Sequence, residues 1–88
     1  MKTKRMIRVK PKTTLGNNIL LCLGALGWSV TKAMVESGVD RAVIYTWMSN
    51  TYRPSMDGVM SLVSAFRDAG LDVSVEDLNA EGFYPRMK

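Results

Sequence analysis

Helix-capping residues and glycines divide this chain into short helical segments. Gly27 and Gly38 follow apolar segments at places where a helix can end in a left-handed residue. Ser29 and Asp40, two residues after each of these glycines, are favoured N-cap residues. Alternating apolar and polar runs bounded by turn residues, which indicate strands, are nearly absent after Lys12. The sequence therefore predicts an all-α fold.

Five helices are predicted from these limits and from apolar periodicity. The predicted ranges are 14–25, 30–37, 41–50, 56–69 and a short last helix that ends at 78 or 79. In the fourth range, apolar residues recur at three- and four-residue steps: Val59, Leu62, Val63 and Phe66. Ser74 and Asp77 form a capping-box-like start for the last helix. The helices fit one compact domain at 13–79, between an N-terminal arm at 1–12 and a C-terminal tail at 80–88.

Basic residues are concentrated in the first part of the chain. Residues 1–53 have a net charge of +7, whereas residues 54–88 have a net charge of −3. Six basic residues lie in the arm: Lys2, Lys4, Arg5, Arg8, Lys10 and Lys12. This asymmetry indicates a polyanionic partner, nucleic acid or an acidic membrane surface, with a basic surface kept for solubility as the alternative. We expect the arm to contact DNA; otherwise it is a solvated tail, or residues 6–10 form an intermolecular strand.

Several other kinds of site are disfavoured. The apolar run 19–28 is shorter than the roughly 20 residues that a membrane-spanning helix needs. Residues 11–18 separate this run from the basic start, unlike in a secretory signal. The chain has no histidine and one cysteine, Cys22, which is expected to be buried; neither a strong metal site nor an internal disulfide is expected. Ser29 and Lys32 match a pattern of penicillin-recognising enzymes, but the further motifs of those enzymes are absent. We therefore expect a cytoplasmic protein that is not an enzyme and has no cofactor or small-molecule ligand.

The residues around Gly38 predict two short helices joined by a tight turn. Ile44 and Trp47 are three residues apart on the second of these helices, so they share a face that we expect to pack inward. For Trp47, a stacking surface for bases is the alternative. The opposite face carries small or polar residues of a kind that enters a major groove: Arg41, Ala42, Tyr45, Thr46 and Ser49. This pattern predicts a helix-turn-helix that binds DNA.

The order of these features resembles the lambda-repressor/Cro family of phage and bacterial transcriptional regulators. The resemblance covers about residues 14–79 and rests on Gly38, Ile44, Trp47, the run Arg53-Pro54-Ser55 and residues 71–78. It implies a compact five-helix DNA-binding domain whose third helix is the recognition helix, and usually a dimer on a two-fold operator. Two positions differ from the family pattern. Met34 replaces a small residue, which predicts a wider helix crossing or a shifted register, and Val30 replaces a frequent glutamine.

The resemblance also implies which residues contact DNA. Base contacts fall on Arg41, Ala42, Tyr45 and Thr46. For Arg41 the alternative is a phosphate contact or a solvated charge near Asp40, and for Tyr45 and Thr46 it is plain helix surface. Phosphate contacts fall on the start of the second helix and the region where the third helix ends: Ser29, Thr31, Lys32, Ser49, Asn50, Tyr52 and Arg53.

The expected function is repression of transcription by a homodimer bound to an inverted repeat, as in phage or prophage repressors. We predict the dimer surface in the last helix and tail, away from the basic half of the chain, at Val75, Leu78, Phe83 and Tyr84. Two alternatives stay open: an antitoxin that represses its own operon while it holds a toxin, and a protein-interaction module of the anti-repressor type that does not bind DNA.

Overall fold

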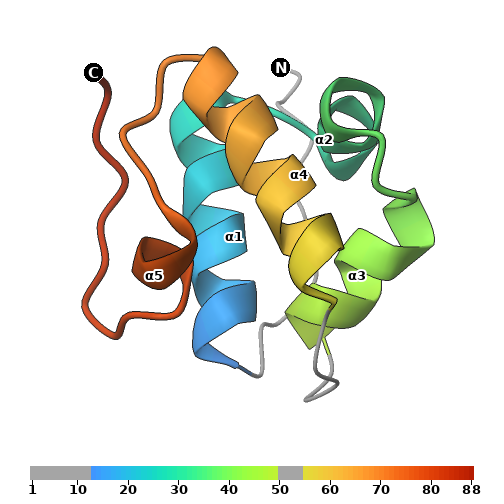
Figure 1. The fold of residues 1–88 in the computed structure, drawn as a ribbon, viewed down its shortest axis with the longest axis horizontal. Coiled ribbons are helices and arrows are strands. Elements are labelled where there is room, and N and C mark those ends of the chain that lie inside the picture. Colours follow the sequence, from blue (N-terminus) through green and yellow to red (C-terminus); the bar gives the residue numbers. More distant parts are fainter. Residues whose placement is uncertain (1–12, 50–54) are drawn as a thin grey trace, which may run out of the picture.

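The computed structural model describes residues 13–49 and 55–88, which form five α-helices around one core (Figure 1). The helices are α1 Thr14–Leu26, α2 Val30–Ser37, α3 Arg41–Ser49, α4 Met56–Asp68 and α5 Val75–Leu78. The predicted all-α fold with five helices is confirmed. The predicted N-terminal arm and residue Asn50, the expected end of the third helix, lie outside the described residues.

Local side-chain contacts determine where these helices begin. Four N-caps are hydroxyl side chains that accept a hydrogen bond from the backbone N–H three residues later: Thr13, Ser29, Ser55 and Ser74. At the start of α3, the Asp40 carboxylate accepts a hydrogen bond from the Ala42 N–H at 3.1 Å. Each cap satisfies an amide that has no partner within the helix, a contact worth about 1 kcal/mol. Capping residues close in sequence therefore place the helix starts.

The turn between α2 and α3 depends on a glycine in the left-handed conformation. Gly38 has φ 80° and ψ 1°, and its N–H donates to the Met34 carbonyl at 2.8 Å. A side chain at this φ would be strained. The chain then passes through Val39, which is buried, and enters α3 at Arg41. The predicted turn at Gly38 is confirmed.

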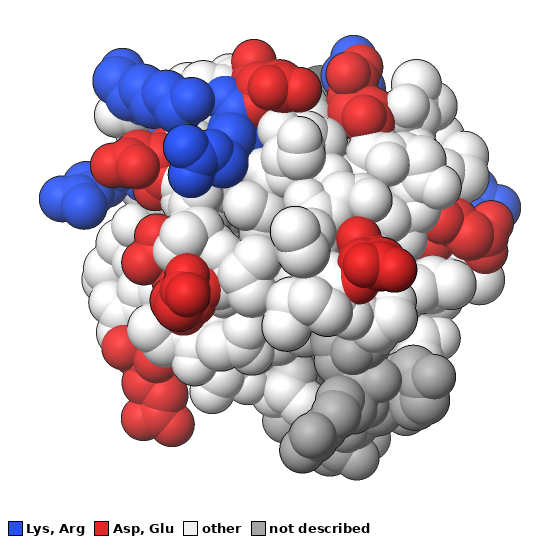
Figure 2. All heavy atoms as spheres, in the orientation of Figure 1, with Lys and Arg blue, Asp and Glu red and all other residues white. Residues whose placement is uncertain are grey.

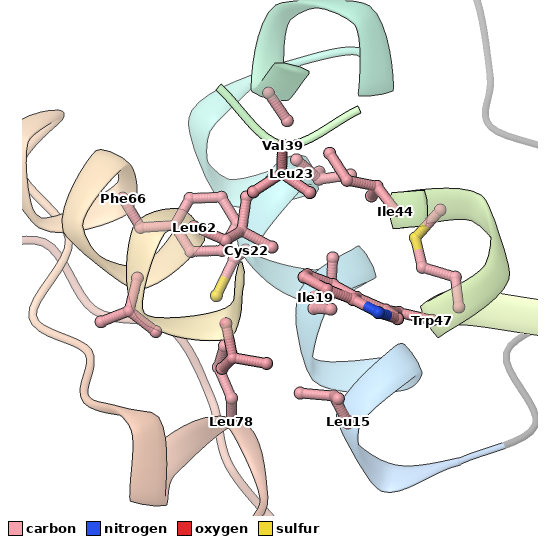
Figure 3. Packing of buried hydrophobic residues seen from close by; sticks show 14 of the residues in the cluster. Leu15, Ile19, Cys22, Leu23, Val39, Ile44, Trp47, Leu62, Phe66 and Leu78 are labelled. Atoms are coloured by element: carbon pink, nitrogen blue, oxygen red, sulfur yellow. The ribbon is translucent and has the colours of Figure 1, made fainter. Parts of the chain in front are cut away.

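The core is formed by apolar residues from all five helices. Figure 3 shows Ile44 and Trp47 of α3 directed towards Ile19 and Leu23 of α1. Trp47 is buried, which confirms its core position and excludes its ring face as an exposed stacking surface. Cys22 is buried as well. Helix α1 contacts α3 and α5, while α2 packs against α3 and α4. This packing leaves one side of α3 exposed.

Two glycines allow the helices to approach α3 closely. A Cβ atom at Gly16 of α1 would lie 2.8 Å from the Met48 carbonyl oxygen. A Cβ atom at Gly58 of α4 would lie 2.7 Å from Cη2 of the Trp47 ring. Both distances are shorter than ordinary van der Waals contacts, so a larger residue at either position requires a neighbour to move. These glycines position the C-terminal half of α3.

Residues after α4 are held by contacts with α1 and with each other. The Asn18 amide of α1 is buried and donates hydrogen bonds to the carbonyls of Asp77, Leu78 and Ala80, at 3.2, 2.9 and 2.9 Å. The predicted capping box at the start of α5 is present. Backbone hydrogen bonds of 2.7 Å join residues 70–72 to residues 86–88, around an antiparallel bridge between Leu71 and Met87.

One of the four residues predicted for the dimer surface, Leu78, is not on the surface. Leu78 is fully buried in the domain's own core, so its side chain cannot contact a second copy in this fold. Val75 and Phe83 are partly buried and pack against the same core. Tyr84, which is 76% exposed, is the one residue of the four whose side chain is largely accessible. The sequence pattern did not reveal this because α5 is too short to show a buried and an exposed face.

In the part of the chain that the structure describes, no single helix is both long and apolar enough to span a membrane. Helices α1 and α2 reach that length and composition only as a pair, and the chain bends by 92° between them.

Candidate nucleic-acid interface

Helices α2 and α3 form a two-helix unit with a buried side and an exposed side. The buried residues of both helices belong to one core cluster: Val30 and Ala33 of α2, and Ile44, Trp47 and Met48 of α3. The buried small residue of α2 is therefore Ala33, five residues before the turn glycine. Met34, the predicted departure from the family pattern, is partly buried. Val30 is buried, so its side chain is not available for a phosphate contact.

The exposed side of α3 contains the residues predicted to contact bases. Arg41, Ala42 and Tyr45 are exposed, and Thr46 is partly exposed. Val43 is 40% exposed, similar to Tyr45 at 39%. Val43 was not among the residues predicted for this face, although the helical period set by Ile44 and Trp47 is sufficient to place it at the edge. The face thus combines one cation with apolar and aromatic groups.

Two hydroxyl groups on α3 donate to its own backbone. The Thr46 hydroxyl donates to the Ala42 carbonyl at 2.9 Å. The Ser49 hydroxyl donates to the Tyr45 carbonyl at 2.7 Å. Each hydroxyl has one proton, so neither group has a proton left to donate to a ligand in this arrangement.

The N-terminal ends of α2 and α3 lie close together. The Arg41 guanidinium donates to Thr31 Oγ1 at 3.4 Å, which connects a predicted base-contacting residue to a predicted phosphate-contacting residue. Ser29, Thr31 and Lys32 are all exposed at the start of α2. The Lys32 ammonium lies 3.0 Å from the Glu36 carboxylate, so its charge is partly balanced within the helix. The structure therefore brings Arg41 of α3 next to the predicted phosphate-contacting residue Thr31 of α2.

Other predicted contact residues lie outside the described residues. These are Asn50, Tyr52 and Arg53 after α3, and the six basic residues of the arm: Lys2, Lys4, Arg5, Arg8, Lys10 and Lys12.

The described residues have more acidic than basic side chains. They contain five of the twelve Lys and Arg and all eight Asp and Glu, a net charge of −3. Figure 2 shows the face over α4, where acidic side chains are spread across the surface and basic atoms gather mainly at the upper left. At the right, where α2 and α3 lie, the same view shows little basic surface. The positive charge of the chain is thus concentrated in residues 1–12 and Arg53.

An open hollow of about 390 Å³ lies beside the exposed face of α3. Its lining residues come from α3 and from the start of α4: Ala42, Val43, Thr46, Trp47 and Ser55. The hollow is wide and open to solvent, so its shape suits the edge of a larger partner better than an enclosed small molecule.

Ser29, Lys32 and Cys22, which have side chains of possible chemical interest, each have defined surroundings in the structure. Ser29 Oγ accepts from the Lys32 N–H at 3.0 Å, and the Lys32 ammonium pairs with Glu36, so this pair performs helix capping and ion pairing. Burial raises the pKa of the Cys22 thiol to about 12, and the Asp77 carboxylate adds to the rise. A protonated thiol is a poor nucleophile. Across residues 13–49 and 55–88, no group of three or more His, Cys, Asp or Glu is placed to hold a metal ion.

Comparison of the chain with protein-family models, with curated proteins and with solved structures finds no match.

Proposed function

We propose that this chain is a sequence-specific DNA-binding regulator of transcription, a cytoplasmic repressor of the phage or prophage type. It binds an inverted-repeat operator as a homodimer and places α3 in the major groove. The observation that carries the proposal is the unit of α2 and α3, in which Arg41 of the exposed α3 face contacts Thr31 at the start of α2.

The dimensions and dipoles of this unit suit duplex DNA. A major groove about 12 Å wide admits an α-helix together with its side chains. The first turn of α2 has exposed residues and a helix N-terminus, which favours a nearby anion such as a backbone phosphate. In the proposed complex, α2 lies against the phosphates and Arg41 at the start of α3 contacts a base.

The charge distribution supports a role for the N-terminal arm in affinity. A net charge of −3 on the described residues repels DNA at long range, whereas residues 1–12 carry six basic and no acidic side chains. In this proposal the arm supplies much of the attraction to phosphates, and α3 supplies the choice of sequence.

The test begins with selection of bound sites from a random DNA pool by the full chain. Binding to the selected duplex is then measured at several salt concentrations, because release of counterions makes the affinity of a DNA-binding protein fall steeply as salt rises. An inverted repeat among the selected sequences is the expected result. Failure to bind any duplex at low salt refutes the proposal.

Two substitutions test the roles of the helices. Arg41→Ala is expected to relax the preference at one base position, by about 1–3 kcal/mol of discrimination. Lys32→Ala is expected to weaken binding to all sequences alike and to reduce the salt slope by about one. Arg86→Ala, which removes an exposed charge from the C-terminal tail, is the control and should change neither quantity. Identical effects of the first two substitutions would contradict the assigned orientation of α3.

A protein-interaction module that does not bind DNA is the second candidate. The net negative charge of the described residues favours this candidate, and so do the exposed side chains of Val43 and Tyr45. In that case Arg41→Ala leaves duplex binding unchanged, because any attraction to DNA then comes from the basic arm alone and lacks sequence preference.

A further inference from the structure

The outward surface of α3 is poor in hydrogen-bond donors beyond Arg41. The exposed residues that follow it are Ala42, Val43 and Tyr45, of which only the Tyr45 phenol has a polar side-chain group. Asn, Gln, Lys and Glu side chains, which are common partners of base edges, do not occur in α3. A surface of this composition favours contact with apolar groups.

The hydrogen bond of Thr46 strengthens the preference of the α3 surface for apolar groups. Its hydroxyl proton is donated to the Ala42 carbonyl at 2.9 Å, so the side chain has no proton for a base. Its methyl group takes no part in this bond. On the helix, Thr46 lies one turn after Ala42, and their side chains share the centre of the exposed face.

The hollow beside α3 gives this apolar surface a defined shape. Ala42, Val43, Thr46 and Trp47 of α3 line it together with Ser55, the N-cap residue of α4. Gly58 lets the start of α4 lie against the Trp47 ring, beside the residues that line the hollow. A small apolar group carried on the edge of a larger partner fits this arrangement.

Thymine carries such a group in the major groove, where its C5-methyl is the apolar feature of the A·T pair. We infer that α3 recognises its half-site through thymine methyl groups, which contact Ala42, Val43 and Thr46 next to a base contacted by Arg41. This inference rests on the proposed function, and it specifies the chemistry that the recognition helix selects. Arg41 lies on this face, and the net charge of +7 on residues 1–53 favours a polyanion such as nucleic acid over a neutral protein as the partner of the chain.

The test removes single methyl groups from the DNA. In a duplex selected by the full chain, each thymine is replaced in turn by 2′-deoxyuridine, which keeps the hydrogen-bonding edge and lacks only the C5-methyl. We expect affinity to fall about fourfold at one or two thymines of each half-site, the factor that corresponds to about 0.8 kcal/mol per buried methyl. Thymines elsewhere in the duplex are expected to tolerate the replacement.

Two variants of Thr46 test whether its methyl group contacts one of these thymine methyls. Thr46→Ser keeps the hydroxyl and loses the methyl, so it is expected to bind the thymine and uracil duplexes equally well at one position. Thr46→Val keeps a methyl and loses the hydroxyl, so it is expected to retain the fourfold difference there. Circular dichroism and thermal unfolding of each variant show whether the helix is preserved.

The outcomes separate the inference from the proposed function. If every uracil duplex binds like its thymine counterpart while Arg41→Ala still relaxes sequence preference, the inference is overturned and the proposed function stands. If Thr46→Ser keeps the full uracil effect at every position, the assignment of a methyl contact to Thr46 is overturned. If no duplex is bound at low salt, the proposed function fails and the inference fails with it, and the apolar face is then left as a protein-binding surface.

Discussion

The close contact between α1 and α3 makes a strong prediction about one glycine. In Gly16→Ala, the new Cβ atom would lie 2.8 Å from the Met48 carbonyl oxygen and 2.9 Å from the Met48 Cα. Both are backbone atoms of a helix, so neither can rotate away as a flexible side chain does. The two helices must separate by several tenths of an ångström. Gly24 of the same helix is the matched control, because no atom lies within 4 Å of a Cβ built there.

The expected magnitudes follow from these two environments. Overpacking of a core contact costs about 1–3 kcal/mol in stability. Because a Cβ at Gly16 would meet the rigid backbone of Met48, the cost of this substitution is expected in the upper half of that range. Alanine gains about 1 kcal/mol over glycine in a helix interior. Gly16→Ala is therefore expected to lower the free energy of unfolding by about 1–2 kcal/mol, whereas Gly24→Ala raises it by up to about 1 kcal/mol. The two variants are thus expected to differ by about 1–3 kcal/mol, which corresponds to a separation of roughly 4–24 °C in Tm.

Urea unfolding followed by tryptophan fluorescence, together with thermal unfolding followed by circular dichroism, measures both variants against the parent chain. Trp47 is buried at the displaced interface, so its fluorescence also reports a change in local packing. If Gly16→Ala is as stable as Gly24→Ala, the close approach of α1 to the backbone of α3 is incorrect. The position of the exposed face of α3 relative to α1 would then need revision.

Two further predictions concern buried polar groups. Asn18→Leu leaves the carbonyls of residues 77, 78 and 80 without their buried donor and is expected to cost about 1–3 kcal/mol in urea unfolding, whereas Asn17→Leu, at an exposed position, should change stability little. Burial, aided by Asp77, raises the pKa of Cys22 from 9.0 to about 12, so the unfolded state loses this proton first. The free energy of unfolding should therefore fall as pH rises from about 9 towards 12, and the fall should be smaller in Cys22→Ala; an equal fall in both would show that the thiol does not titrate in this way.

The helices were predictable from sequence because their limits depend on residues close together in the chain. Ser29 caps α2 through the Lys32 N–H, and Gly38 ends the same helix through the Met34 carbonyl. Both contacts span three or four residues, so they follow from local geometry alone. The inward position of Ile44 and Trp47 followed from helical period for the same reason.

Contacts between distant segments were not predictable in this way. Asn18 contacts residues about 60 positions later in the chain, and its polar side chain gave no sign of full burial. Gly16 looked like an ordinary helix residue because its partner, the backbone of Met48, is set by how α1 crosses α3. The burial of Leu78 depends on the same packing.

The candidate site falls between these two cases. The residues on the exposed face of α3 follow from its period, but the contact of Arg41 with Thr31 requires the relative orientation of α2 and α3. The hollow beside Val43 also depends on the position of Ser55, the N-cap residue of α4, which no pattern within α3 indicates.

Geometry and charge are divided between different parts of this chain. The described residues supply a shaped, mostly apolar face on α3 but have a net charge of −3, whereas most of the positive charge lies in residues 1–12 and Arg53. Phosphate contacts give affinity without sequence information, and contacts with base edges give sequence information at modest energy. If both parts act on the same duplex, changes in α3 alter which sequence is preferred and leave the salt dependence nearly unchanged, while changes in the arm do the opposite. This separation is the signature that distinguishes a DNA-binding α3 from a basic arm attached to a protein-binding domain.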